Sequence, residues 1–416
     1  MMKPCDGTMT TGALAGIRVI DASQMLAGPI CAMRLGDLGA DVIKVEPPGR
    51  GEYNRTHGFG PLRIGGETPT FLGLNRNKRS VVLDLKHPDG LATLLDIVRS
   101  SDVFLQNYRV GTAERLGVGW EQLHAVNPRL VCGQISGYGE HGPYRDRPGQ
   151  DLLVQAMSGS MWAVGAAGDP PQPGALWAVD AMTGYQAAIG VLAALIARGR
   201  TGEGQKVMVS MLTTVLDCQV QELVAFLNGG LEPERPTVAT AHALIPAPYG
   251  VYRAADGWLV LAMAPLAALG DALDDHRLRR MDDEVDGTVN REAIDAILRP
   301  ILASRTTAEW IAHFDARRLW SGRVYTYAEL VADPHLAAIG GLVEVEHPIA
   351  GRIRMPAPPI HLSATDSAVR RPPPRLGEHT DEVLDEVLGY DRNRIERLRA
   401  RGAFGTPQGA PEGVTS

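Results

Sequence analysis

The chain has 416 residues, 44% hydrophobic and 21% charged, which is typical of a globular protein. Its 41 Lys and Arg against 48 Asp and Glu give a net charge of −7. This charge argues against nucleic acid as a partner, because phosphate binding needs a surplus of positive surface. The length predicts two domains, or one large domain with an insertion.

The cysteines and apolar runs indicate the compartment. Cys5, Cys31, Cys132 and Cys218 are far apart and show no zinc-type spacing, a pattern that favours a reducing cytoplasm over a disulfide framework. The opening MMKPCDGTMTTGALAG lacks the apolar core of a signal peptide. The longest apolar run, 187–197, is shorter than the ~20 residues of a membrane span. We therefore expect a cytoplasmic protein without a membrane partner.

Strands and helices alternate in the N-terminal half. Short β-type runs predict strands at Arg18–Ala22, Asp41–Val45, Ser80–Leu85, Asp102–Leu105 and Arg129–Ile135. Apolar spacing predicts helices at Ala27–Leu38 and, after Pro88, at Asp89–Arg99. This alternation predicts an α/β fold with a parallel sheet, whose ligands lie at the carboxyl ends of strands. Neither a G-x-G-x-x-G after the first strand nor a P-loop motif occurs, so the usual nucleotide signatures are absent.

The pattern changes after this half. In chain order, we expect a turn and strand at Thr201–Met211, a long helix at Leu212–Leu227, a β-hairpin of Tyr249–Tyr252 with Trp258–Met263, helices at Arg291–Ala303 and Thr307–Ala316, and an amphipathic helix at Asp381–Ala400. The tail from Gly402 is expected to be disordered.

A basic segment is the first candidate for chemistry. Arg76-Asn77-Lys78-Arg79 precedes a predicted strand, Lys86 and His87 follow it, and Arg115 lies in a later helix. Arginine clusters at sheet edges suit phosphate groups. The alternative is a solvated surface patch.

Asp151 is the second candidate. In PGQDLLVQAMSG, Pro148 and Gly149 end a loop and an apolar helix begins at Leu152, so Asp151 falls at a helix N-terminus. There the macrodipole and free N–H groups favour the ionised carboxylate, which can act as a nucleophile. The alternative is a simple helix cap, and the same two interpretations apply to Asp180 in WAVDAMTG.

Eight segments together resemble the class III CoA-transferase family, which includes formyl-CoA transferase and the 2-methylacyl-CoA racemases. In the family's order, these segments are LAGIRVIDAS, AGPICAMRLGDLGADVIKVEPPGRGE, NRNKRSVVLDLK, DVFLQNYRVGTAERLG, NPRLVCGQISGYGEHGPYRDRPGQDLLVQAMSG, TGEGQKVMVSML, DPHLAAIG and RLGEHTDEVL. They span nearly the whole chain.

The resemblance implies a large Rossmann-like domain built from both ends of the chain, an inserted small α+β domain, and an interlocked homodimer. The implied boundaries are 1–205 for the N-terminal part of the CoA-binding domain, 206–235 for a linker, 236–345 for the small domain, and 346–416 for the return segment, with its C-terminal helix and tail. It also implies a coenzyme A thioester as substrate, with no permanently bound cofactor and no metal.

The resemblance also assigns site residues. Asp151 matches the catalytic aspartate of the transferases. The matches to CoA contacts are Leu26 and Ala27 after the first strand, Leu83 to Lys86 near the adenine and phosphates, Asn107, Tyr108 and Arg115 beyond them, and Gly137 and Tyr138 near the thioester. Pro47 and Ser136 depart from the pattern, since formyl-CoA transferase has arginine and lysine there, and specificity for oxalate and formate is therefore not expected.

One position separates the branches of the family. The racemases have a histidine immediately before the aspartate that matches Asp151, and use it with an aspartate that matches Asp180 as two opposed bases. This chain has Gln150 there, and an amide does not exchange protons at neutral pH. The transferase branch is therefore favoured: CoA moves from an acyl-CoA to a carboxylic acid through an aspartyl–acyl anhydride and an aspartyl-CoA thioester. The alternatives are an acyl-CoA isomerase, by racemisation or intramolecular CoA transfer, and a non-catalytic acyl-CoA-binding relative.

Overall fold

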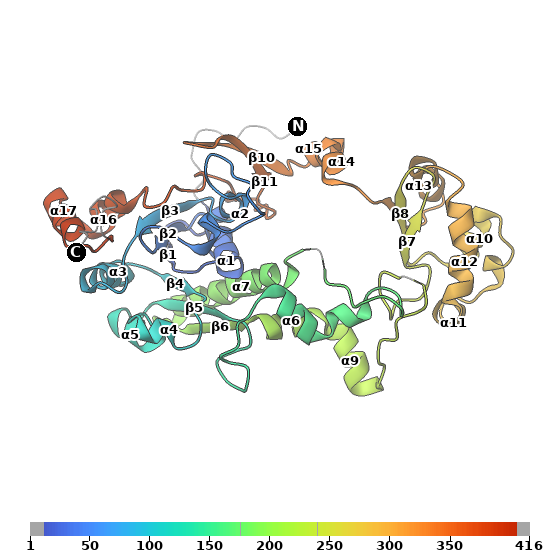
Figure 1. The fold of residues 1–416 in the computed structure, drawn as a ribbon, viewed down its shortest axis with the longest axis horizontal. Helices are drawn as coiled ribbons and strands as arrows, with labels where there is room; N and C mark the ends of the chain where they lie inside the picture. Colours follow the sequence, from blue (N-terminus) through green and yellow to red (C-terminus); the bar gives the residue numbers. More distant parts are fainter. Residues whose placement is uncertain (1–11, 175, 239, 406–416) are drawn as a thin grey trace, which may run out of the picture. The chain divides into compact units, whose positions relative to one another are not determined.

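The computed structural model describes residues 12–174, 176–238 and 240–405, and Figure 1 traces their elements along the chain. The chain divides into two compact units. Unit 1 comprises the described parts of Met1–Asp151, Ala178–Thr214 and Ala337–Ser416, and unit 2 those of Leu152–Trp177 and Val215–Leu336. Segments of unit 2 thus alternate along the sequence with segments of unit 1.

A six-stranded parallel sheet with strand order β3-β2-β1-β4-β5-β6 forms the centre of unit 1. Its strands are β1 (Arg18–Asp21), β2 (Asp41–Glu46), β3 (Lys78–Val82), β4 (Val103–Gln106), β5 (Val131–Ser136) and β6 (Lys206–Ser210). The prediction of an α/β fold with a parallel sheet is confirmed. The third strand begins two residues before the predicted Ser80, because Lys78 and Arg79 are buried within the sheet region.

Helices cover both faces of this sheet. Successive strand residues point to opposite faces, so Val19 and Val103 pack against α1 (Ala27–Asp37) and α7 (Ala178–Thr201), whereas Ile20 and Phe104 pack with α3 (Pro88–Arg99), α5 (Trp120–Val126) and α16 (Thr380–Leu388). The remaining elements of unit 1 are η1 (Tyr53–Arg55), α2 (Pro69–Leu74), α4 (Thr112–Arg115), the antiparallel pair β10 (Leu342–His347) and β11 (Gly351–Pro356), and α17 (Arg392–Ala400).

Unit 2 has its own core around the antiparallel sheet β7-β8-β9. Leu259 of the sheet packs with helical residues such as Ile294, Trp310 and Phe314. Its elements are η2 (Ser160–Ala163), α9 (Val220–Gly229), β7 (Gly250–Arg253), β8 (Trp258–Leu261), α10 (Leu266–Leu273), η3 (Leu278–Arg280), α11 (Val285–Val289), α12 (Arg291–Leu302), α13 (Thr307–Asp315), β9 (Ser321–Arg323) and α14 (Tyr327–Ala332). Three short helices cross or adjoin the boundaries between the units: α6 (Asp151–Ser158), α8 (Met211–Cys218) and α15 (Pro334–Ala338).

Two long helix predictions were wrong. The predicted helix Leu212–Leu227 is divided into α8 and α9 at Gln219, whose φ of −102° and ψ of 30° are not helical. The predicted helix Asp381–Ala400 is divided into α16 and α17 at Gly389, whose φ of 64° is left-handed and ends α16. Asp391 then caps α17 by accepting a hydrogen bond from the Arg394 N–H at 2.6 Å.

The described part of the expected tail is packed: Ala403 is buried, and its carbonyl accepts a hydrogen bond from the Asp84 N–H at 2.9 Å. Residues 406–416 and Cys5 lie outside the described residues. Cys31, Cys132 and Cys218 are free thiols.

Helix α7 (Ala178–Thr201) is longer than the apolar run 187–197 that it contains. Within the described parts of the chain, it is the one helix that is long and apolar enough to cross a membrane by length and composition. It contacts α1 and strands β5 and β6, and Ala187 and Val191 belong to the buried cluster on that face of the sheet. The side of α7 that faces the sheet therefore belongs to the core of unit 1.

Candidate active site

A cavity of about 370 Å³ opens at the carboxyl ends of three neighbouring strands of unit 1. Gln24, Met25 and Ala27 follow β1, the stretch 107–110 follows β4, and Ser136 and Gly137 end and follow β5. Parallel strands bring their carboxyl ends to one edge, so residues far apart in sequence meet there. The cavity therefore lies where the strand pattern predicts a ligand.

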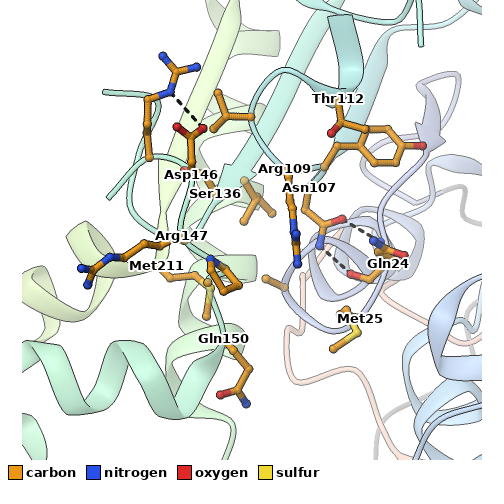
Figure 2. A pocket seen from close by; sticks show the side chains of 18 of the residues that line it. Gln24, Met25, Asn107, Arg109, Thr112, Ser136, Asp146, Arg147, Gln150 and Met211 are labelled. Carbon is orange, nitrogen blue, oxygen red and sulfur yellow. Dashed lines mark hydrogen bonds and ion pairs between the residues drawn. The ribbon is translucent and has the colours of Figure 1, made fainter. Parts of the chain in front are cut away.

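The wall after β1 is held from two sides. The Asn107 side chain accepts a hydrogen bond from the Gln24 N–H at 2.9 Å and donates one to the Gln24 carbonyl at 2.7 Å (Figure 2). Met25 has a left-handed φ of 68°. Its N–H donates to the buried Glu52 carboxylate at 3.2 Å, and its carbonyl accepts from the Asn54 side chain. These contacts fix a backbone conformation that a non-glycine residue rarely adopts.

The opposite wall is a loop whose two ends touch through glycines. A Cβ on Gly137 would lie 2.5 Å from the Gly149 Cα, so neither position accommodates a side chain without movement of the backbone. Within the loop, Glu140 accepts from Lys206 Nζ at 2.6 and 2.8 Å and from the Gln134 side chain at 2.7 Å. The closed loop sets the position of the residues that follow it, Gln150 and Asp151.

Asp151 begins α6 and is 1% exposed. Its Oδ2 accepts a hydrogen bond from the backbone N–H of Asp180, in the first turn of α7, at 3.0 Å. Asp180 lines the cavity together with Gln150. Burial, and secondly the negative charge of Asp151, raise the pKa of Asp180 to about 7. The site therefore holds two carboxyl groups, one of which can carry a proton at neutral pH.

Arginine side chains supply positive charge to the cavity. Figure 2 shows Arg109 extending into the space between Met25 and Met211, whereas Arg147 points away from it. Among the described residues, no ion pair or hydrogen bond involves the Arg109 side chain, and Arg115 donates to Thr112 Oγ1 at 2.8 Å. Guanidinium groups suit phosphates and carboxylates, so the cavity matches an anionic ligand.

A second, smaller hollow of about 180 Å³ adjoins Tyr108, which lines both cavities. Leu83, Lys86 and Pro47 line it at the carboxyl ends of β2 and β3. Its walls are mostly apolar, and its charged lining residues are Lys86 and three acids, Glu46, Glu52 and Asp84. Such walls suit a flat apolar group.

The family model for CoA-transferase family III matches residues 14–380. The chain belongs to this family. It is 34% identical to the succinyl-CoA:glutarate CoA-transferase of Mus musculus, over 94% of this chain and 90% of that protein. It is 36% identical to the succinyl-CoA–L-malate CoA-transferase beta subunit of Chloroflexus aurantiacus, over 95% and 99% of the two chains. The crystal structure of a CAIB/BAIF family protein from Brucella suis matches with a TM-score of 0.81 and 29% identity, over 91% and 100% of the chains.

The predicted general function, CoA transfer, and the predicted enzyme class are confirmed: the protein is a class III CoA-transferase. Its substrates are accordingly CoA thioesters and carboxylates. The CoA contacts expected from the resemblance are distributed over the two hollows, with Ala27, Asn107, Tyr108, Arg115 and Gly137 in the larger and Leu83, Lys86 and Tyr108 in the smaller. Leu26 lines neither of these hollows, nor does Tyr138, whose ring meets that of Tyr144 with centroids 6.1 Å apart. Asp151 adjoins two residues of the cavity lining. Gln150 precedes it in the chain, and the backbone N–H of Asp180 donates a hydrogen bond to its carboxylate.

Both interpretations of the basic segment Arg76–Arg79, as a phosphate site and as a solvated surface patch, are wrong. Arg76 donates to the Asp37 carboxylate at 2.8 Å, and Arg79 donates to Asp41 at 2.7 Å. Lys78 is fully buried and donates to Asp21 Oδ2 at 2.8 Å. These cations are bound by acids on other elements and take part in folding.

Sequence reasoning missed several cavity residues. Gln24 and Met25 carried no signal, because their positions depend on Glu52 and Asn107 further along the chain. Arg109 could have been found, since it follows the Asn107-Tyr108 match directly.

Proposed function

We propose that the enzyme transfers CoA between dicarboxylic acids through covalent intermediates on Asp151. The buried Asp151 carboxylate, at a helix N-terminus beside a cavity with arginines, is the observation that carries the proposal. The named relatives use succinyl-CoA with glutarate or malate, which supports the dicarboxylic class.

The transfer proceeds in four steps. An Asp151 oxygen attacks the thioester carbonyl carbon of the donor, the carbon–sulfur bond breaks, and an aspartyl–acyl anhydride forms. The CoA sulfur then attacks the Asp151 carbonyl carbon and releases the first acid as its carboxylate. The acceptor carboxylate attacks the resulting aspartyl-CoA thioester, and the sulfur finally attacks the acyl carbon of the new anhydride, which restores Asp151. One thioester replaces another, so the overall free-energy change is small.

The cavity residues hold the substrates during these steps. We propose that the hollow at Leu83 and Lys86 receives the CoA nucleotide and that Arg115 binds one of its phosphates. We propose that Leu26, Gly137 and Tyr138 contact CoA when it is bound. Arg109 is available for the second carboxylate of the acid. Holding the CoA while its sulfur is detached converts the return attack into an intramolecular step, and the walls must exclude water because an anhydride hydrolyses readily.

A panel of acids tests the reaction and its substrate class. Succinyl-CoA is incubated with glutarate or malate, and with pentanoate, which lacks the second carboxylate of glutarate. Mass spectrometry should detect glutaryl-CoA or malyl-CoA and little pentanoyl-CoA, and Arg109→Ala should remove most of this preference. Turnover without an acceptor acid, with deuterium entering C2 of an acyl-CoA in heavy water, would instead establish an isomerase. Retained CoA binding without any turnover would establish the non-catalytic relative.

We further propose an interlocked homodimer, in which the large domain is built from both ends of the chain and the small domain is inserted. Tyr185, Ile189 and Ile196 of α7 and Met208 of edge strand β6 are exposed in the single chain, and apolar faces of this kind are usually covered by a partner. Light scattering at micromolar concentration should give the mass of a dimer. A stable folded monomer would contradict this assembly.

We propose a cytoplasmic location, supported by the free thiols of Cys31, Cys132 and Cys218. Such thiols persist in a reducing compartment. Fractionation of cells should recover the enzyme with soluble cytoplasmic markers, and recovery with membranes or secreted proteins would contradict this location.

A further inference from the structure

In the proposed transfer, Asp151 acts as the nucleophile and does not stabilise the CoA sulfur that leaves. A free thiol has an ordinary pKa of about 8.5. When the carbon–sulfur bond breaks, the negative charge moves from Asp151 to the sulfur, and a thiolate is unfavourable in a water-poor site. A group that protonates the sulfur as it leaves, and deprotonates it as it returns, would lower both barriers.

Asp180 is placed to do this. Its backbone N–H is bonded to Asp151 Oδ2 at 3.0 Å, which ties the two residues together. Asp180 lines the same cavity as Gln150 and Ala27. It therefore combines a direct hydrogen bond to the nucleophile with a place in the wall of the substrate cavity.

The other acid–base groups of this cavity are less suited. Asp146 is paired with Arg145 at 3.5 Å, and its side chain is 79% exposed. Burial raises the pKa of Tyr108 to about 12. The lining arginines do not release protons, and no histidine is among the described residues that line the cavity.

We propose that Asp180 is a further catalytic residue, a carboxylic acid that gives its proton to the CoA sulfur as the carbon–sulfur bond breaks and takes it back when that sulfur attacks. This inference rests on the proposed function of Asp151. In acylation, the bond from Asp151 oxygen to the acyl carbon forms, the carbon–sulfur bond breaks, and the proton moves from Asp180 to sulfur. In the next step, the proton returns to Asp180, sulfur bonds to the Asp151 carbonyl carbon, and the acyl carboxylate leaves.

The charges around Asp180 favour this exchange. Burial, together with the charge of Asp151, raises the pKa of Asp180 to about 7, so a large share of the enzyme holds the proton at neutral pH. Acylation removes the charge of Asp151, which lowers the pKa of Asp180 at the moment when the sulfur needs the proton. The guanidinium of Arg109 shares the cavity, while Arg34 on neighbouring α1 is engaged by Asp37 at 2.9 Å and Tyr185 at 3.3 Å.

Asp180→Asn tests the proposal, because asparagine keeps the size and the backbone N–H but is not an acid. The exposed Glu203, away from the cavity, provides the matched acid-to-amide control, Glu203→Gln. We measure kcat and KM against pH, and single-turnover acylation with enzyme in excess. The wild type should slow as pH rises above about 7, the range in which Asp180 loses its proton. Asp180→Asn should lose about 10²-fold or more in kcat with KM little changed and should lack this limb of the profile; Asp180→Glu should regain part of the rate, and Glu203→Gln should match the wild type.

Wild-type kcat and pH profile in Asp180→Asn would overturn the proposal. If this variant does not fold, single-turnover acylation of the wild type in heavy water decides the matter: a slower rate supports proton transfer, and an equal rate contradicts it. Failure of the underlying function gives a different result, since the wild type would then form no CoA adduct on Asp151 at all.

Discussion

Two groups of acids in unit 1 have opposite surroundings. Asp21, at the end of β1, is fully buried with Lys44 and Lys78, whose Nζ atoms lie 3.4 and 2.8 Å from its Oδ2. Asp151 and Asp180 meet each other through a backbone hydrogen bond. The cations keep the first acid charged, whereas burial, and secondly the charge of Asp151, allow Asp180 to hold a proton near neutral pH.

The pKa values of Asp21 and Asp180 are shifted in opposite directions. Burial raises the pKa of Asp21, but the two lysines outweigh it and hold the pKa well below the usual range. Burial and Asp151 act in the same direction on Asp180 and raise its pKa to about 7. A fully paired acid contributes to the fold, while an acid kept beside another acid can take part in chemistry near neutral pH.

Removing Asp21 should have the largest effect on stability. Asp21→Ala leaves two buried lysines without their shared carboxylate, and breaking a buried pair in this way costs about 3–5 kcal/mol. The free energy of unfolding is measured in urea, with Glu203→Gln as the control. A loss below about 1 kcal/mol would show that the cluster is dispensable.

Asp180→Asn should instead stabilise the protein, and more so at high pH. Because the folded-state pKa of Asp180 is raised from 3.8 to about 7, its contribution to stability is fully present below the unfolded pKa and is lost as pH rises to about 7. Asparagine carries no such penalty. The melting temperature of the variant relative to the wild type should therefore increase between pH 5 and pH 8, by the equivalent of about 1–3 kcal/mol given the partial exposure of the side chain.

A difference in melting temperature that stays constant with pH would contradict the assignment of a raised pKa to Asp180. Glu203→Gln, whose carboxylate is exposed, should show no such trend over the same range.

Arg115→Ala should leave the stability of the fold unchanged and affect only the binding of the ligand. Loss of a charge-assisted hydrogen bond to a CoA phosphate should weaken acyl-CoA binding by ~1.5–3 kcal/mol. Titration calorimetry measures the affinity, with Arg99→Ala on α3, an exposed arginine paired with Asp96, as the control. Unchanged affinity in Arg115→Ala would remove this residue from the binding site.

The sequence was sufficient for the sheet and for the helix start at Asp151. Apolar strands separated by proline and glycine carry their own signal, and so does a carboxylate after Pro148 and Gly149. The partners of the buried cations were not predictable, because Lys78 meets Asp21 only when β1, β2 and β3 align. The contact of Asp180 with Asp151 could not be predicted either. It depends on the packing of α7, and it is made by a backbone N–H, which carries no sequence signal.

Covalent capture on Asp151 distinguishes a nucleophilic Asp151 from one that only caps its helix. The enzyme is incubated with succinyl-CoA, treated with hydroxylamine and digested, and peptides are analysed by mass spectrometry. We expect an aspartyl hydroxamate on the peptide that contains Asp151, and none in Asp151→Asn, which should also lose turnover while remaining folded. A hydroxamate on another carboxylate, or normal turnover in the Asp151→Asn variant, would contradict this expectation.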